Sequence, residues 1–144
     1  MNWEQADITI MEYLQANWTA CKVSYAGSDH LDYSSPGQPK LEDGQDPFII
    51  FDLIHERSAP IGIPTGCIRL YGFLSASIYV REGSGRVASV KLADQLNSLL
   101  QFNTIPGSSS GEVRIKEFLD DGVFEADGWE IRSCQWPFET EDFV

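Results

Sequence analysis

The segment CIRLYGFLSASIYVREGSG, residues 67–85, constrains the fold more than any other part of this 144-residue chain. Up to residue 81 it contains no proline, and apolar residues recur at every second position, which is the pattern of a β-strand. At roughly 3.3 Å per residue, such a strand reaches about 50 Å. A compact domain of this length has a diameter under about 40 Å. We therefore expect the strand to bend or to be covered by protein outside its own chain.

The alternation gives this predicted strand two different faces. One face is apolar and is expected to meet the core. The other combines aromatic residues, serines and arginines, a composition typical of a surface that contacts protein part of the time. We interpret this second face as a candidate subunit interface, and packing of the second predicted helix against it is the alternative. The candidate interface residues are Tyr71, Phe73, Ser75, Ser77, Tyr79 and Arg81.

A second strand is predicted at residues 48–57, FIIFDLIHER. The nine residues 58–66 carry two prolines and two glycines, so they are expected to interrupt the strand and turn the chain. The two strands should therefore pair as a long antiparallel hairpin. Gly72 is the expected place for a bend or bulge in it.

Two helices are predicted, at 3–17 and 86–101, from apolar residues at helical spacing. Asn2 and Gln5 have the spacing of a capping box at the start of the first helix. The predicted strands and helices do not alternate along the chain, so the order of elements does not predict parallel crossovers. We expect an α+β fold, with a mostly antiparallel sheet of four to five strands and the two helices packed on one face. The other strands are predicted at 21–25, 112–119 and 129–137.

Residues 26–46 have no periodicity and are rich in Gly, Ser, Pro and Asp. A loop of this length inside a compact domain is usually functional or disordered. Too little chain precedes it to form a separate domain. We therefore expect residues 1–144 to form a single domain with a long mobile loop at 26–46.

Charge and composition exclude several classes of protein. The formal net charge of −12 argues against a nucleic-acid-binding surface, which needs clustered Lys and Arg. No apolar run is long enough to span a membrane, and the acidic N-terminus does not resemble a signal peptide. The three cysteines have no metal-binding spacing and are expected to be reduced, buried thiols. Residues 112–144 carry ten acidic residues against three basic ones, so one strongly negative end is expected.

No convincing catalytic site is present in the sequence. GSSSG at 107–111 matches a nucleophile-elbow pattern centred on Ser109, but a helix precedes it and a strand follows, which is the reverse of the order that motif needs. His30 lies beside Asp29 and Asp32 in the long loop, where solvation is the simpler interpretation. We expect no catalysis, no cofactor and no metal.

The end of the chain resembles a known protein family. Gly128-Trp129 begins a strand that closes on Trp136-Pro137-Phe138. Together with the N-terminal helix and the strand pair PFIIFDLI and IRLYGFLSASIYVREGSGR before a leucine-rich helix, this layout resembles the tail terminator proteins of long, non-contractile-tailed bacteriophages, the lambda-like minor tail protein U family.

The resemblance implies a structural role. Such proteins form a ring, typically of six subunits, at the head-proximal end of the tail tube. The ring stops tube polymerisation and presents the surface that joins the head, so the implied partners are copies of itself, the tail tube protein and a head-completion or neck protein. The implied location is the virion tail, after assembly in the host cytoplasm. Alternatives are a head–tail connector or completion protein of similar fold and, in another class, a small hydrolase using Ser109.

Overall fold

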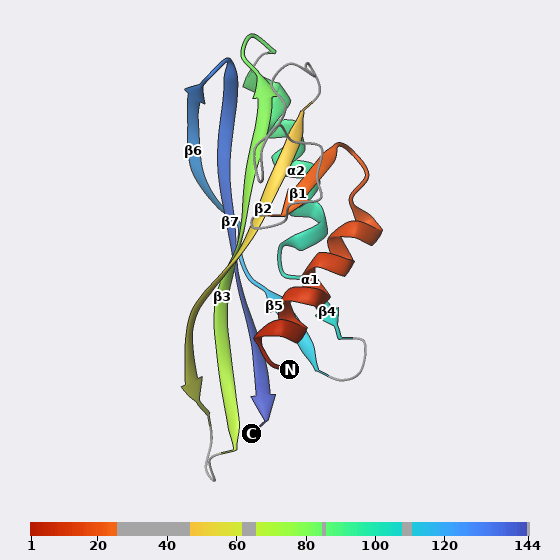
Figure 1. Cartoon of the computed structure of the whole chain (residues 1–144), viewed down its shortest axis with the longest axis vertical. Coiled ribbons are helices and arrows are strands. Elements are labelled where there is room, and N and C mark those ends of the chain that lie inside the picture. The colour runs from red at the N-terminus through yellow and green to blue at the C-terminus, as the bar shows by residue number, and fades with distance from the viewer. Residues whose placement is uncertain (26–46, 62–65, 85, 108–110, 144) are drawn as a thin grey trace.

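A computed structural model gives the architecture of the chain (Figure 1). It describes residues 1–25, 47–61, 66–84, 86–107 and 111–143, so the predicted loop at 26–46 lies outside the described residues. The helices are α1 (Trp3–Asn17) and α2 (Arg86–Leu100). The strands are β1 (Lys22–Tyr25), β2 (Phe48–Pro60), β3 (Cys67–Arg81), β4 (Thr104–Pro106), β5 (Glu112–Ile115), β6 (Leu119–Ala126) and β7 (Trp129–Phe143).

The strands of the described residues form one curled, mixed sheet of seven. Its order is β1-β2-β3-β7-β5-β4, and β6 also pairs with β7. β1 and β2 are parallel, whereas the other pairs are antiparallel. With 54% of the described residues in strands and 26% in helices, the described part of the chain is mostly β. The expectation of a mostly antiparallel sheet of four to five strands is therefore wrong: it omitted β4 and β6 and excluded the parallel pair.

β6 was omitted because its sequence contains Asp121-Gly122 and ends at Asp127-Gly128, and both pairs predict turns. Only the second pair makes one. Asp127 and Gly128 have φ of 53° and 82°, as the two-residue turn between β6 and β7 requires. The first pair instead forms a bulge inside the strand, where Gly122 has φ 94° and its N–H donates to the Asp120 side chain.

β7 continues through Pro137, where the sequence predicted its end. Proline has no N–H to donate and is normally confined to sheet edges. The Pro137 carbonyl accepts a hydrogen bond from the Lys116 N–H, on the side of β7 that faces β5 and β6. The missing N–H would lie on the same side, in the gap on β7 between Gln135, which pairs with the first residue of β6, and Phe138, which pairs with the last residue of β5. The strand therefore continues without losing a ladder hydrogen bond.

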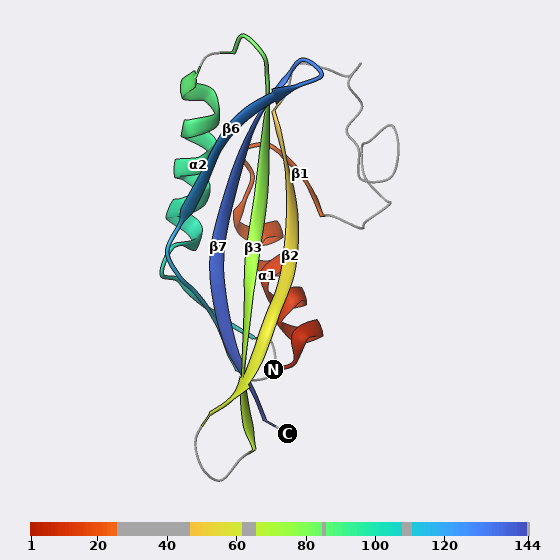
Figure 2. The same ribbon diagram turned by 90° about the vertical axis from the view of Figure 1, so that its left-hand side faces the viewer.

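Both helices cover one face of the sheet, which we call the inner face; the opposite face is the outer face and is turned toward the viewer in Figure 2. The predicted capping box at Asn2 and Gln5 is confirmed. Alternate residues of β3 and β7 point into the same core, which is centred on the fully buried Trp136. Within the described residues, neither helix is long and apolar enough to cross a membrane. Helix residues of this core are Ala6, Ile10, Leu14, Ala93, Leu96 and Leu100.

The fifteen residues of β3 stay extended, because β7 pairs with all of them and β2 pairs with most of them. The bulge predicted at Gly72 lies in the partner strand, between His55 and Arg57, with Gly72 opposite His55. A Cβ atom on Gly72 would lie 2.6 Å from Phe138 Cζ and 2.7 Å from the Ile54 carbonyl oxygen. Glycine therefore allows the ring of Phe138 to close over the sheet at this point.

We predict that Gly72→Ala lowers the free energy of unfolding by about 1–3 kcal/mol, because the added methyl group overpacks the contact with Phe138 and backbone. Urea denaturation measures it. Gly66→Ala is the matched control, since a Cβ there meets no atom within 4 Å. Equal stability of the Gly72→Ala variant and the wild type would show that this close approach does not constrain the sheet.

Candidate functional site

The six predicted interface residues lie together on the outer face of β3, and each is partly buried. The helices pack on the inner face, so the alternative in which α2 covers these residues is wrong. No helix of the described residues covers the outer face of the central strands (Figure 2). The outer face is therefore available for contact with another molecule.

Because β2, β3 and β7 are paired in register, their outer side chains form rows across the sheet. One row joins Phe48, Tyr79 and Ile131, and Phe124 of β6 extends it. Phe48 stacks on Tyr79 with ring centroids 4.5 Å apart. Phe124 is 57% exposed, whereas Phe48 and Ile131 are buried. This end of the outer face, which we call the aromatic end, therefore continues into an exposed aromatic side chain on an edge strand.

Trp129 completes the aromatic end. Its ring meets Phe48 edge-on at a centroid distance of 4.9 Å, and the Arg81 guanidinium lies 4.1 Å from its centroid, in cation–π geometry. The indole N–H of Trp129 is buried, and no group among the described residues accepts a hydrogen bond from it. A buried donor in this state costs free energy, so the aromatic end carries a polar group that packing alone leaves unsatisfied.

The middle of the outer face carries small and polar side chains. Ser75 and Ser77 lie opposite Gln135 and Ser133 of β7. The next row toward the other end is apolar, with Phe73 between Ile54 and Pro137. Ile54 is 42% exposed. Ser75 and Ser77 are short side chains beside an exposed apolar row, so the backbone of another molecule can approach this part of the sheet closely.

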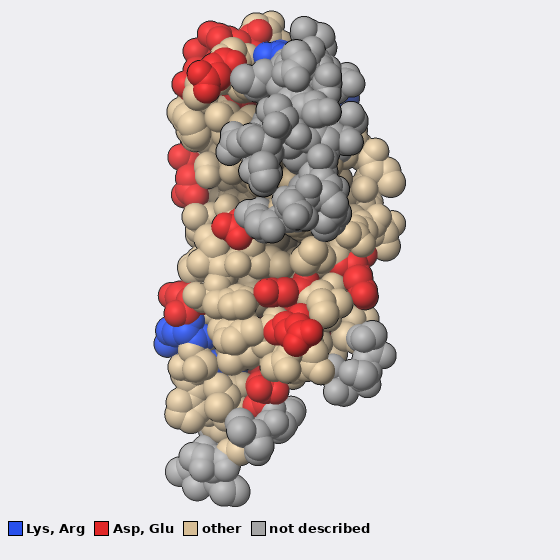
Figure 3. All heavy atoms as spheres, viewed as in Figure 1, with Lys and Arg blue, Asp and Glu red and all other residues tan. Residues whose placement is uncertain are grey.

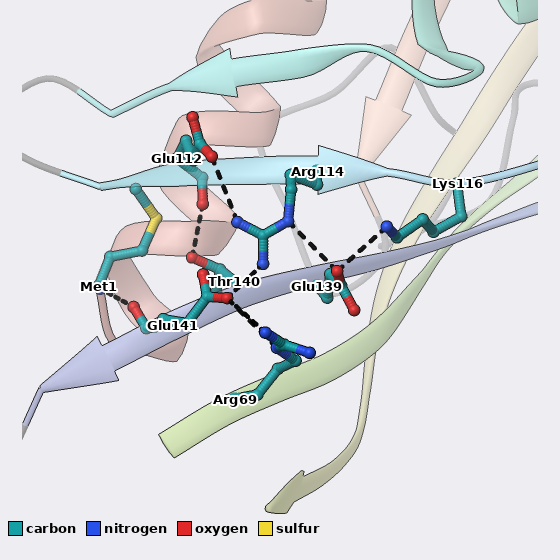
Figure 4. Close-up of polar contacts among 8 residues, drawn as sticks. All are labelled: Met1, Arg69, Glu112, Arg114, Lys116, Glu139, Thr140 and Glu141. Carbon is teal, nitrogen blue, oxygen red and sulfur yellow. Dashed lines mark hydrogen bonds and ion pairs between the residues drawn. The ribbon is translucent and has the colours of Figure 1, made fainter. Parts of the chain in front are cut away.

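The other end of the outer face, which we call the charged end, carries an ion-pair network (Figure 4). Arg114 donates to Glu141 at 2.6 Å, to Glu139 at 3.2 Å and to Glu112 at 3.3 Å. Arg69 also donates to Glu141, at 3.0 Å. A further ion pair joins Lys116 to Glu139 at 3.0 Å. β3, β5 and β7 are therefore connected by charge as well as by backbone.

These contacts change the protonation of the carboxylates. Hydrogen bonds from Arg114, assisted by Arg69, lower the pKa of Glu141 below its ordinary value of 4.5. Burial acts in the opposite direction on Glu139, but Lys116 and Arg114 outweigh it and lower the pKa of that group too. Both carboxylates are therefore ionised in the folded protein at neutral pH.

The groups considered for catalysis are not brought together. Ser109 and His30 lie outside the described residues. His55 stacks on Trp3 at 4.1 Å and contacts the Asp7 carboxylate at 3.0 Å, on the helix side of the sheet. Among the described residues no group of three or more His, Cys, Asp or Glu side chains is arranged to hold a metal ion.

Two cysteines are weak candidates for nucleophiles. Burial raises the pKa of the Cys134 thiol to about 12 and that of Cys21 to about 11. Both thiols therefore stay protonated at neutral pH. Buried, protonated thiols behave as small apolar side chains.

Sequence reasoning found the central row of this surface but missed its neighbours. The sequence gives little signal for Phe124, because the Asp-Gly pairs on both sides of it predict turns. The ion-pair network was missed because Glu139 and Glu141 lie beyond Pro137, where the strand was expected to end. The alternation of Glu139, Thr140 and Glu141 is the signal that was available, since it places both carboxylates on one face of an extended segment.

Comparisons with known proteins bear on the fold alone. No family model matches the sequence, and no curated protein matches it either. Sixteen chains of known structure match the fold. One of them, a protein without a functional name, has 11% sequence identity and a TM-score of 0.70, over 100% of this chain and 99% of its own. At this identity the likeness shows a shared fold, and unrelated functions occur on shared folds.

We predict that Arg114→Met lowers the free energy of unfolding at neutral pH by about 1–2 kcal/mol, because partly buried Glu139 and Glu141 lose a charged donor. The folded-state pKa of Glu141 is lowered, so its contribution is complete above 4.5 and is lost as pH falls through the lowered value. Urea denaturation across a pH series should show the wild type and the variant converging in acid.

Lys91→Met on the exposed side of α2 is the control, because it removes one positive charge without touching this network. It should change stability little at any pH. A stability difference for Arg114→Met that stays constant into strong acid would contradict the proposed role of the carboxylates.

Proposed function

We propose that this chain is a structural protein of a phage tail, which forms a ring that caps the tail tube, ends tube polymerisation and provides the head-joining surface. The proposal combines the family resemblance of the sequence with one structural observation. The outer face of the three longest strands carries partly buried aromatic and apolar side chains that no helix of the described residues covers. Such a surface is typical of protein–protein contact.

The outer face supports contact between copies in particular. A sheet buries one face on its own helices and is usually polar on the other. Here the second face holds the stacked pair Phe48 and Tyr79, Trp129 beneath Arg81, and the exposed Ile54. Phe48 and Trp129 are already buried within the monomer, so a second copy would remove from water mainly the exposed part of Ile54 and Tyr79, at roughly 25 cal/mol per Å² of gross gain.

Ring formation follows from the kind of contact. One copy that uses two different surfaces to bind its neighbours builds an open filament or a closed ring, according to the rotation at the contact. A ring with a net charge of −12 per copy also suits a channel that DNA must cross, because acidic walls repel phosphate. This activity needs shape and charge, and no catalytic group.

We predict that Ser75→Arg, in the low middle of the outer face, abolishes self-association without unfolding the monomer, because a long charged side chain props two surfaces apart. Sedimentation velocity over a wide concentration range, with negative-stain imaging of the most concentrated samples, measures it. The wild type should associate with increasing concentration into closed rings, six subunits being the expected number.

Val87→Arg is the matched control: Val87 is 74% exposed, on α2 and away from the outer face, so this change should leave association intact. Circular dichroism checks that both variants keep the wild-type secondary structure. A wild-type chain that stays monomeric at every concentration and yields no cross-linked oligomer would refute the ring.

A further inference from the structure

β6 differs from the other described strands because it contributes little to the core. No residue of β6 is buried, whereas the shorter β5 has buried Val113 and Ile115. Elements that bury few apolar side chains open at a lower cost in free energy than the core around them. β6 is therefore held mainly by its backbone ladder with β7 and by a few polar contacts. Its large apolar side chains, 40%, 40% and 57% exposed, are Leu119, Val123 and Phe124.

One of these polar contacts is an ion pair near the start of β6. Arg132 of β7 is 8% exposed, and its guanidinium donates to the Asp120 carboxylate at 2.7 Å and to the Ser89 hydroxyl of α2 at 3.1 Å. A buried cation therefore joins the edge strand to the helix across the strand between them. Loss of the carboxylate charge would leave this cation without its counter-charge, which is costly in a buried site. We call this contact the Asp120–Arg132 clasp.

The other end of β6 carries a repulsive contact. Glu125 lies directly opposite Glu130 of β7, and like charges in this position destabilise an antiparallel pair. We call these two residues the acidic pair. Repulsion from Glu82, in the turn after β3, is the largest cause that raises the pKa of Glu125, and repulsion from Glu130 adds to it. Figure 3 shows acidic side chains gathered at this upper end of the molecule.

Contacts outside the strand hold both ends of β6 in place. Before it, the Phe118 N–H donates to the Gln101 side chain at 3.0 Å, and the Phe118 ring packs against the core. After it, the Gly128 carbonyl accepts a hydrogen bond from the Glu82 N–H at 2.9 Å. None of these contacts involves residues 119–126, so they can persist when that segment separates from β7.

We propose that β6 is a releasable strap: residues 119–126 leave the edge of β7 together while the rest of the sheet stays folded. In the closed state β6 pairs with β7 from Trp129 to Gln135. When it opens, this stretch becomes a free sheet edge, which is the kind of surface that accepts an extended strand from another molecule.

The two ends of the strap act in opposite directions. The clasp keeps it closed, and the acidic pair favours its opening. The inference concerns a single copy of the chain. It goes beyond the proposed function and does not rest on self-association.

Hydrogen–deuterium exchange with mass spectrometry tests the strap, on the full chain at a concentration where it is monomeric. Peptides from residues 119–126 and 129–135 should exchange through one shared opening, faster than peptides from β3. Because β6 buries little apolar surface, this opening should depend weakly on added urea, whereas exchange in β3 should accelerate strongly.

Two substitutions that each remove one negative charge from β6 should have opposite effects. Asp120→Asn keeps an acceptor oxygen but weakens the clasp, so protection of residues 119–126 should fall about fivefold, the size expected for a partly exposed ion pair. Glu125→Gln relieves the repulsion, so exchange of the same peptides should slow. Exchange in β3 should stay unchanged in both variants.

Asp94→Asn, exposed on α2, is the matched control, because it removes the same charge away from the strap and should leave the exchange of β6 unchanged. Exchange of β6 at the rate and urea dependence of β3 would overturn the strap, since the sheet would then open as one unit. Effects of Asp120→Asn and Glu125→Gln in the same direction, or no effect of Asp120→Asn, would overturn the control by charge. Each of these outcomes leaves the proposed ring standing, because self-association is measured separately.

Discussion

The fold depends on the pairing of β3 along its whole length. β7 matches every residue of β3 from Cys67 to Arg81, and β2 matches it on the other side from Ile68 to Tyr79. This ladder fixes which residues face the helices and which face outward, because a slip by one residue would exchange the two sets. The core, the aromatic end and the ion pairs all depend on this single register. Its tightest point is Gly72, where Phe138 and the bulge of β2 meet.

The length of β3 also explains the shape of the molecule. The sequence predicts that so long a strand bends or is covered from outside, and in the structure β3 lies in a curled sheet between two long strands of the same chain. These flanking strands satisfy the backbone of β3 and leave its outer side chains without a helix over them. The surface offered to other molecules is therefore a consequence of how the long strand is stabilised. Composition then distinguishes its two ends, with the stacked aromatic side chains at one and the ion-pair network at the other.

Local patterns predicted the elements whose signals are local. The capping box at Asn2, both helices and the bounds of β3 follow from periodicity and turn residues. The parallel pairing of β1 and β2 did not, because it depends on a connection between strands that a helix usually makes. The connection from Tyr25 to Phe48 is long enough to join two parallel strands even though no helix is predicted in it. The length of this connection was therefore a better signal for the parallel pair than the presence of a predicted helix.

The other wrong predictions have one physical cause: the same residue types adopt different structures in different contexts. Asp121-Gly122 makes a bulge where Asp127-Gly128 makes a turn, and Pro137 continues a strand because its missing donor faces a gap between β6 and β5. The outer face of β3 was identifiable from alternation alone. Its extension onto Phe124 and Glu139 required the pairing of distant strands, which no local pattern encodes.

Hydroxyl-radical footprinting of the associated protein tests most directly whether the outer face is where copies meet. Phe73 and Phe124 should become protected on association, whereas Phe102, which is 70% exposed and lies just beyond α2, should react equally in both states and serves as the internal reference. Protection confined to the helices, with Phe73 and Phe124 as reactive in the oligomer as in the monomer, would contradict the account.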